Sequence, residues 1–237
     1  MRNDAGGLVD DPDLTSEVRE ASEANTDTSV EQINSSQRAE MLDEVNELRG
    51  FAGLARSITV NQKAVKLFDA LEQGFEKLQE IGAPEKAIIF TDSTVTQNYL
   101  ARSLTDAGWG EGLILFNGSN DSPESKRIYD KWLKENHGGD LVTGIAAADR
   151  RKALVDEFRD RGRLMIATEA AAEGINLQFC SMLVNYDLPW NPQRIEQRIG
   201  RVHRFGQKHN VIVVNFSNKG NLAEERILEL LSEKFQL

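Results

Sequence analysis

Cysteine is almost absent from this sequence, since Cys180 is the only one among 237 residues. A single cysteine excludes an internal disulfide, and three scattered histidines beside it make no cluster of metal ligands, so we expect no bound metal. Long apolar runs are also lacking, because none approaches the ~18 residues that span a membrane, and the first residues carry no apolar signal region. We therefore expect a cytoplasmic protein with no membrane partner.

Two kinds of nucleotide-binding signature are missing as well. No Gly-Lys dipeptide occurs, which excludes the Walker A loop that cradles a triphosphate, and no predicted strand ends in the paired Walker B acids that hold magnesium. The closely spaced glycines of "GWGEG" (108–112) precede a predicted strand, whereas a dinucleotide-binding loop links a strand to a helix. We therefore expect this chain alone to be inactive in nucleotide hydrolysis.

The negative charge of the chain is concentrated at one end. The formal net charge is −10, but residues 1–50 hold 13 acidic and 4 basic side chains, and the remaining residues hold 25 and 24. The acidity therefore belongs to the N-terminal segment and does not argue against a nucleic-acid partner for the rest. Residues 1–30 carry almost no large apolar side chains, so we expect a disordered acidic tail there.

The remaining pattern predicts a helical region followed by alternating strands and helices. Residues 31–84 show helical spacing and form a helical extension that leads into a lobe at 85–237. Within that lobe, short runs that are apolar on both faces alternate with amphipathic helical segments. This alternation predicts an α/β fold with a doubly wound, mainly parallel sheet. The expected strands are 86–91, 112–116, 163–168, 181–187 and 210–216.

An unusual cluster of arginines lies in "QRIEQRIGRVHRFGQ" (193–207). Asn191 and Pro192 suit the N-cap and first position of a helix, and Gly206 suits its end. On that helix the arginines and Gln197 would form one stripe beside an apolar stripe that faces a core. The arginines concerned are Arg194, Arg198, Arg201 and Arg204.

Several motifs in register make the sequence resemble the second RecA-like lobe of two-lobed helicases, in the branch of SWI/SNF-type remodellers and RapA. "KAIIFTDS" (86–93) resembles motif IV, and a Thr168-bearing strand leads into motif V. The motifs V and VI and the two branch markers read Gly174-Ile175-Asn176-Leu177, Gln197-x-x-Gly200-Arg201-x-x-Arg204, Trp190-Asn191-Pro192 and His203-Arg204-x-Gly206-Gln207.

The resemblance implies a motor that translocates along double-stranded DNA at the expense of ATP. ATP with magnesium would be held mainly by a first RecA-like lobe that this sequence lacks, so the chain resembles a fragment, a split-gene product or an excised domain. Arg201 and Arg204 would reach the phosphates across the cleft as arginine fingers. If the source is bacterial, the protein would associate with the nucleoid. A rival interpretation is a non-enzymatic relic lobe that binds DNA or protein.

The resemblance also assigns supporting residues. Gly174 and Asn176 would couple nucleotide to nucleic acid, and Gln197 would orient the finger helix. Thr168, and by similarity Thr91 and Ser93, would contact nucleic-acid phosphates.

Each of these functional roles has a plainer structural alternative. The finger helix could be a surface helix whose arginines pair with acids such as Glu196, and Thr168 could bond to backbone at a strand end. For Trp190 we expect core packing under the finger helix in preference to DNA contact, and for His203 a structural role. The basic and aromatic segment 117–140 could grip a phosphate backbone, although a solvated helix with one buried aromatic face is favoured.

Overall fold

The computed structural model describes residues 35–57, 61–169, 174–218 and 220–235. The predicted disordered tail, residues 1–30, lies outside the described residues. The chain divides into two compact units, Met1–Gln62 and Lys63–Leu237. In the first unit the described structure is the helix α2 (Ser35–Ser57), which leaves an apolar row of Met41, Val45, Leu48 and Phe51 exposed.

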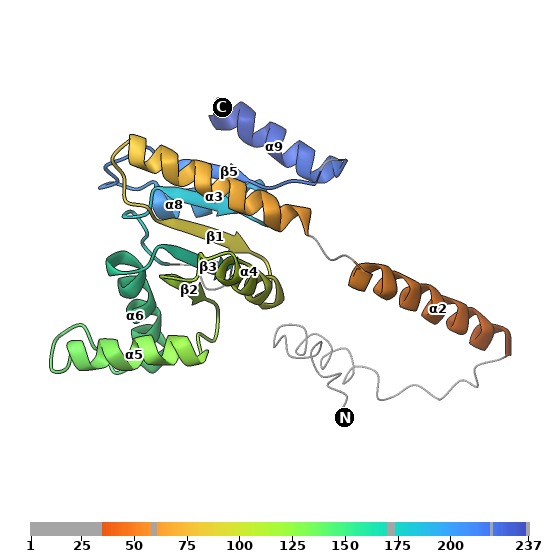
Figure 1. Ribbon diagram of the computed structural model, residues 1–237, viewed down its shortest axis with the longest axis horizontal. Coiled ribbons are helices and arrows are strands. Elements are labelled where there is room, and N and C mark those ends of the chain that lie inside the picture. The colour runs from red at the N-terminus through yellow and green to blue at the C-terminus, as the bar shows by residue number, and fades with distance from the viewer. Residues whose placement is uncertain (1–34, 58–60, 170–173, 219, 236–237) are drawn as a thin grey trace. The chain divides into compact units, whose positions relative to one another are not determined.

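The second unit is built on a five-stranded parallel sheet, as predicted (Figure 1). Its strand order is β2-β3-β1-β4-β5, so the first strand in the sequence is the central one. All five expected strands are present with slightly trimmed ends. They are β1 (Ala87–Thr91), β2 (Leu113–Phe116), β3 (Leu164–Thr168), β4 (Met182–Asn185) and β5 (Ile212–Asn215).

Alternate residues of each strand bury against different helices, which is why the strands are apolar throughout. In β1, Ile88 and Phe90 join the core formed with α5 (Pro123–Glu135) and α6 (Ala146–Asp160). Ala87 and Ile89 join the core on the other face, formed with α3 (Gln62–Glu80) and α4 (Thr94–Asp106). The sheet is therefore covered on both faces, and the predicted α/β fold class is confirmed.

The helix α3 is an integral part of this unit. Its buried side chains Leu67, Leu71, Phe75 and Leu78 pack on the same face of the sheet as α4. The compact unit accordingly begins at Lys63, whereas the sequence pattern assigns residues 31–84 to a helical extension that leads into the lobe. The difference arises because helical periodicity marks an apolar face without saying what covers it.

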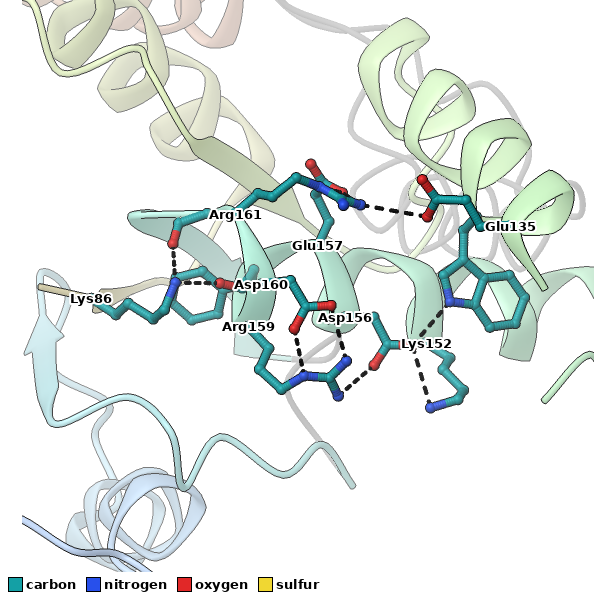
Figure 2. Close-up of polar contacts among 11 residues, drawn as sticks. Lys86, Glu135, Lys152, Asp156, Glu157, Arg159, Asp160 and Arg161 are labelled. Carbon is teal, nitrogen blue, oxygen red and sulfur yellow. Dashed lines mark hydrogen bonds and ion pairs between the residues drawn. The ribbon is translucent and has the colours of Figure 1, made fainter. Parts of the chain in front are cut away.

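The basic segment 117–140 forms α5, which packs on α6 through its aromatic face. Trp132 is buried, and its indole nitrogen donates to Asp156 of α6 at 2.9 Å. Figure 2 shows Asp156 paired with Lys152 and Arg159, and Arg161 reaching Glu135 of α5. These contacts join two helices of one domain, which agrees with the favoured interpretation of a solvated helix with a buried aromatic face.

The C-terminal part adds two helices at the β4 side of the sheet, α8 (Pro192–Val202) and α9 (Leu222–Phe235). Ile195 of α8 packs with Ile227 and Leu231 of α9 in a small separate core.

Cys180 is fully buried, and this burial raises the pKa of its thiol to about 12, as expected of a core residue. Among the described helices, none has the length and apolar character needed to cross a membrane.

Candidate functional site

Three acidic residues meet at one edge of the sheet because they follow three neighbouring parallel strands. Asp92 comes directly after β1, Glu169 directly after β3, and Asp187 two residues after β4. Since β3, β1 and β4 are adjacent, their carboxyl ends place these side chains together. Ligands of open parallel sheets bind at this edge, which makes the cluster part of the candidate site.

A buried arginine from α8 holds the acidic cluster together. The side chain of Arg198 is only 2% exposed, and its Nε donates to Glu169 Oε2 at 2.8 Å. Its Nη1 donates to Asn185 Oδ1 and to the Asp187 carbonyl, each at 2.9 Å, and its Nη2 also contacts Glu169. Asp92 Oδ1 lies 3.5 Å from Nη2. One guanidinium thus joins α8 to the ends of three strands.

The prediction that all four arginines form one outward stripe is therefore wrong for Arg198. At roughly 100° per residue, Arg198 lies about 60° from Ile195 and next to Val202, at the edge of the apolar stripe. This angle is the signal that could have identified it. The burial of a guanidinium at that position is tolerated because carboxylate, amide and carbonyl oxygens satisfy its fork of donors.

Asp187 accepts more of the described hydrogen bonds than the other two carboxylates of the cluster. Burial alone would raise its pKa, but hydrogen bonds from Thr91, Lys63 and the Asp92 backbone N–H, with the positive charge of Lys63, hold that pKa below its usual range. Thr91 Oγ1 donates to Asp187 Oδ2 at 2.6 Å, and Lys63 Nζ donates to Oδ1 at 2.9 Å. Asp187 therefore fastens the start of α3 to the ends of β1 and β4.

Asp92 has the opposite electrostatic character. Desolvation raises its pKa above the usual value, and the nearby charge of Asp187 raises it further, against the attraction of Arg198. Its side chain is 55% exposed, so water still screens much of this repulsion. The cluster as a whole holds three carboxylates against the two cations Arg198 and Lys63.

We expect Asp187→Asn to lower the free energy of unfolding at pH 7 by about 1–3 kcal/mol, because it removes a charged acceptor of three hydrogen bonds. A lowered native pKa gives stability that is present above the unfolded pKa and is lost as the pH falls through the native pKa. The difference between wild type and variant should therefore shrink below about pH 4. Urea unfolding at pH 7, 5 and 3.5 measures it.

The matched control for this substitution is Asp69→Asn in the exposed Lys66–Asp69 pair, with side chains 70% and 47% exposed. That variant should change stability by less than about 0.5 kcal/mol at every pH. A difference for Asp187→Asn that is constant from pH 7 to 3.5 would contradict the assignment of its stabilising contacts to the ionised carboxylate.

The predicted nucleic-acid contacts Thr91, Ser93 and Thr168 lie at the same edge. Thr91 is buried and donates to Asp187, and Ser93 is the N-cap of α4, where its Oγ accepts from the Thr96 N–H at 3.1 Å. Thr168 is 7% exposed and stands opposite Thr91 in the sheet register. Contact of these three with nucleic acid stays a prediction, and the first two already have structural partners.

The predicted coupling residues Gly174 and Asn176 line a groove against α6. Gly174 has a φ of +78°, a left-handed conformation that favours glycine, and open space lies where a side chain would start. The groove has a volume of about 580 Å³, and its α6 wall carries Arg151, Lys152 and Arg159 beside Asp156, which pairs with the last two and leaves the wall with a net positive charge. The groove brings Gly174 and Asn176 together with basic side chains of α6 that were not predicted as site residues from the sequence.

The predicted finger residues lie at the far end of α8. Arg201 is half-buried, and its carbonyl accepts from the Leu177 N–H at 3.0 Å, which fixes the helix end to the loop after Asn176. Gln197 and Arg204 are exposed. The helix begins as expected with Asn191 as N-cap and Pro192 first, but it ends at Val202.

Arg204 therefore lies in the turn after the helix, and its expected place within the helical stripe is wrong. The His203 N–H still bonds to the Ile199 carbonyl, but His203 itself leaves helical geometry, and the left-handed residue Gly206 lies beyond it. Trp190 is 80% exposed, so the expected core packing of its ring is wrong as well. An exposed tryptophan thus precedes α8, and exposed Arg204 follows it.

Among the described residues, no group of three acidic, histidine or cysteine side chains is placed to hold a metal ion. The three carboxylates at the strand ends are occupied by Arg198 and Lys63. Arg198 and Lys63 are thereby engaged, and the arginines of this region that a phosphate-bearing ligand can reach are the half-buried Arg201 and the exposed Arg204.

A parallel sheet covered on both faces, with an arginine helix after β4 and a glycine loop after β3, defines a RecA-like lobe. The family described as "Helicase conserved C-terminal domain" matches residues 66–206, more than half of the chain, and the chain belongs to it. It is 38% identical over 180 residues to the "Uncharacterized ATP-dependent helicase YqhH" of Bacillus subtilis, covering 76% of this chain and 26% of that protein.

Two further relatives confirm the resemblance to the SWI/SNF and RapA branch. Over 69% of this chain, the sequence is 32% identical to human "Transcriptional regulator ATRX". Over 30% of this chain, it is 41% identical to "RNA polymerase-associated protein RapA" of Serratia proteamaculans. It spans only 6% and 7% of those proteins. The chain thus carries a helicase C-terminal domain and spans 26% or less of the length of these relatives.

Proposed function

We propose that this chain is the second motor lobe of a DNA-dependent ATPase that translocates along double-stranded DNA. The observation that carries the proposal is that Arg201 lies in the last turn of α8 and the exposed Arg204 lies two residues after the helix, while Arg198 fixes the middle of the helix to three strand ends. Arg201 is half-buried and Arg204 is exposed, and permanently charged guanidinium groups that solvent can reach suit a phosphate ligand presented by another lobe.

In this proposal ATP and its magnesium are held mainly by a first lobe, in keeping with the lack of Walker motifs in this sequence. Arg201 and Arg204 would meet the phosphate oxygens from the opposite side of the cleft. A planar and permanently charged guanidinium matches phosphate geometry and stabilises the charge that develops during phosphoryl transfer. Gln197, exposed on the same helix, would help to orient the finger helix.

The nucleic acid would lie along the carboxyl edge of the sheet. Thr168 and the basic groove of Arg151, Lys152, Gly174 and Asn176 supply polar and cationic groups for a phosphate backbone. Double-stranded DNA is favoured over RNA because the sequence carries Trp190-Asn191-Pro192 and His203-Arg204-x-Gly206-Gln207, the markers of the branch that remodels protein–DNA complexes.

Binding of a fluorescent duplex DNA to this chain, measured by anisotropy over a range of salt concentrations, tests the nucleic-acid part of the proposal. We expect salt-dependent binding, because each phosphate contact releases a counterion. Arg151→Gln should weaken it, and Arg204→Gln, the same change in a residue assigned to ATP, should leave it unchanged within about twofold. Binding that is equally sensitive to both substitutions, or tighter to a single-stranded RNA, would contradict the proposed assignment.

A further inference from the structure

We infer that Arg198 is a positioning residue, which through Glu169 couples the nucleic-acid segment at the end of β3 to the placement of the finger arginines. This inference rests on the proposed function and deepens it. It concerns residues that take no part in the predicted contacts with ATP or DNA.

Arg198 makes a complete set of contacts. Its guanidinium is 2% exposed, bonds to Glu169, Asn185 and the Asp187 carbonyl, and lies 4.9 Å from the centroid of the Phe90 ring. The Asn185 amide is oriented in turn by its own bond to Asn215 of β5, at 2.7 Å. A planar fork with several partners in fixed directions permits only one orientation of the side chain.

The helix α8 carries the restraint at Arg198 on to Arg201. Arg201 lies one helical turn after Arg198, so any shift or rotation that Arg198 prevents is also prevented at Arg201. The end of the helix is fixed again by the bond from the Leu177 N–H to the Arg201 carbonyl. Arg204 follows two residues after the end of the helix at Val202. Arg201 therefore takes its position from the Arg198 anchor, and the turn that carries Arg204 starts from the same fixed helix end.

Glu169 lies beside the residue that is predicted to contact nucleic acid. It follows Thr168, the residue predicted to contact a nucleic-acid phosphate, without an intervening residue. Its carboxylate is 23% exposed and accepts hydrogen bonds from Nε and Nη2 of Arg198. A displacement of Thr168 by nucleic acid would therefore move the carboxylate that holds the guanidinium. This gives a continuous chain of contacts from Thr168 to α8, and both ends belong to the proposed mechanism.

The test follows backbone amide signals of the isotopically labelled full chain by NMR while a short duplex DNA is added. In wild type, we expect DNA to shift the amide signals of Thr168 and of Arg201 with the same concentration dependence. In Glu169→Gln the Thr168 shift should persist, while the Arg201 shift should fall about threefold or more, because the ionic link to α8 is lost. Glu169→Asp, which keeps the charge, should restore part of it.

Glu229→Gln is the matched control, since it makes the same chemical change in the exposed Arg226–Glu229 pair of α9, and it should behave as wild type. Arg198→Lys keeps the charge but loses the fork, and it should lose the Arg201 shift as Glu169→Gln does. If Glu169→Gln does not fold, the Arg198→Lys variant tests the inference in its place. An Arg201 shift of wild-type size in a folded Glu169→Gln or Arg198→Lys variant would overturn the inference and leave the proposed function standing. If duplex DNA shifts no signal near Thr168 in wild type, the proposed DNA role fails and the inference fails with it.

Discussion

Replacing Arg204 by alanine should lower the DNA-stimulated turnover of ATP by about 10³–10⁵-fold in an enzyme that joins this chain to a nucleotide-binding first lobe. The expected loss is large because an arginine finger stabilises charge that is present mainly in the transition state. Arg204 is exposed, so its removal leaves the fold of this lobe intact. The affinity for duplex DNA should therefore be nearly unchanged, which steady-state kinetics and anisotropy together can measure.

Arg194→Ala is the matched control for Arg204→Ala. Arg194 is also an exposed arginine, on the first turn of the same helix, but it lies outside the motif that the resemblance assigns to ATP. Turnover of the Arg194 variant should stay within about threefold of wild type. Retention of turnover within about threefold in the Arg204 variant would refute the finger assignment.

Arg198→Met should lower the free energy of unfolding of this chain by about 3–5 kcal/mol, because removal of one partner leaves buried groups uncompensated. Methionine keeps most of the side-chain volume of arginine, so the loss reports the contacts of the guanidinium more than a cavity. Glu169, Asn185 and the Asp187 carbonyl all lose a donor. Urea unfolding at pH 7 gives the difference.

The same substitution at the exposed Arg194 should change the free energy of unfolding by no more than about 0.5 kcal/mol. The pair of variants therefore separates the anchoring arginine from an arginine of the outer stripe on one helix. An Arg198→Met protein that unfolds within about 1 kcal/mol of wild type would contradict the anchoring role of this residue.

The sheet could be predicted from the sequence because its signal is local. Each strand is a short run that is apolar on both faces, such as Ala87–Thr91, and each is bounded by polar or glycine-containing segments. The start of α8 was also predictable, since the Asn191 cap and Pro192 depend only on neighbouring residues. The strand order and the cover that α3 provides depend on contacts between distant segments, which periodicity does not report.

The site was only partly predictable for the same reason. The motifs located the finger helix and the glycine loop, but the partners of Arg198 come from three separate segments, represented by Asp92, Glu169 and Asp187. The acids that follow β1, β3 and β4 were visible in the sequence, and the parallel arrangement places such residues at one edge. The end of α8 at Val202 was missed because Gly206 offered a plausible stop one turn later.

The central claim is that this chain supplies one half of a motor, and the most direct test is steady-state ATP hydrolysis by the purified chain. We expect background turnover with and without duplex DNA, and DNA-dependent turnover once a first lobe carrying Walker A and Walker B motifs is joined to the chain. Turnover by the chain alone that follows the protein through purification would contradict the account, as would silence of the joined enzyme when it binds both ATP and DNA.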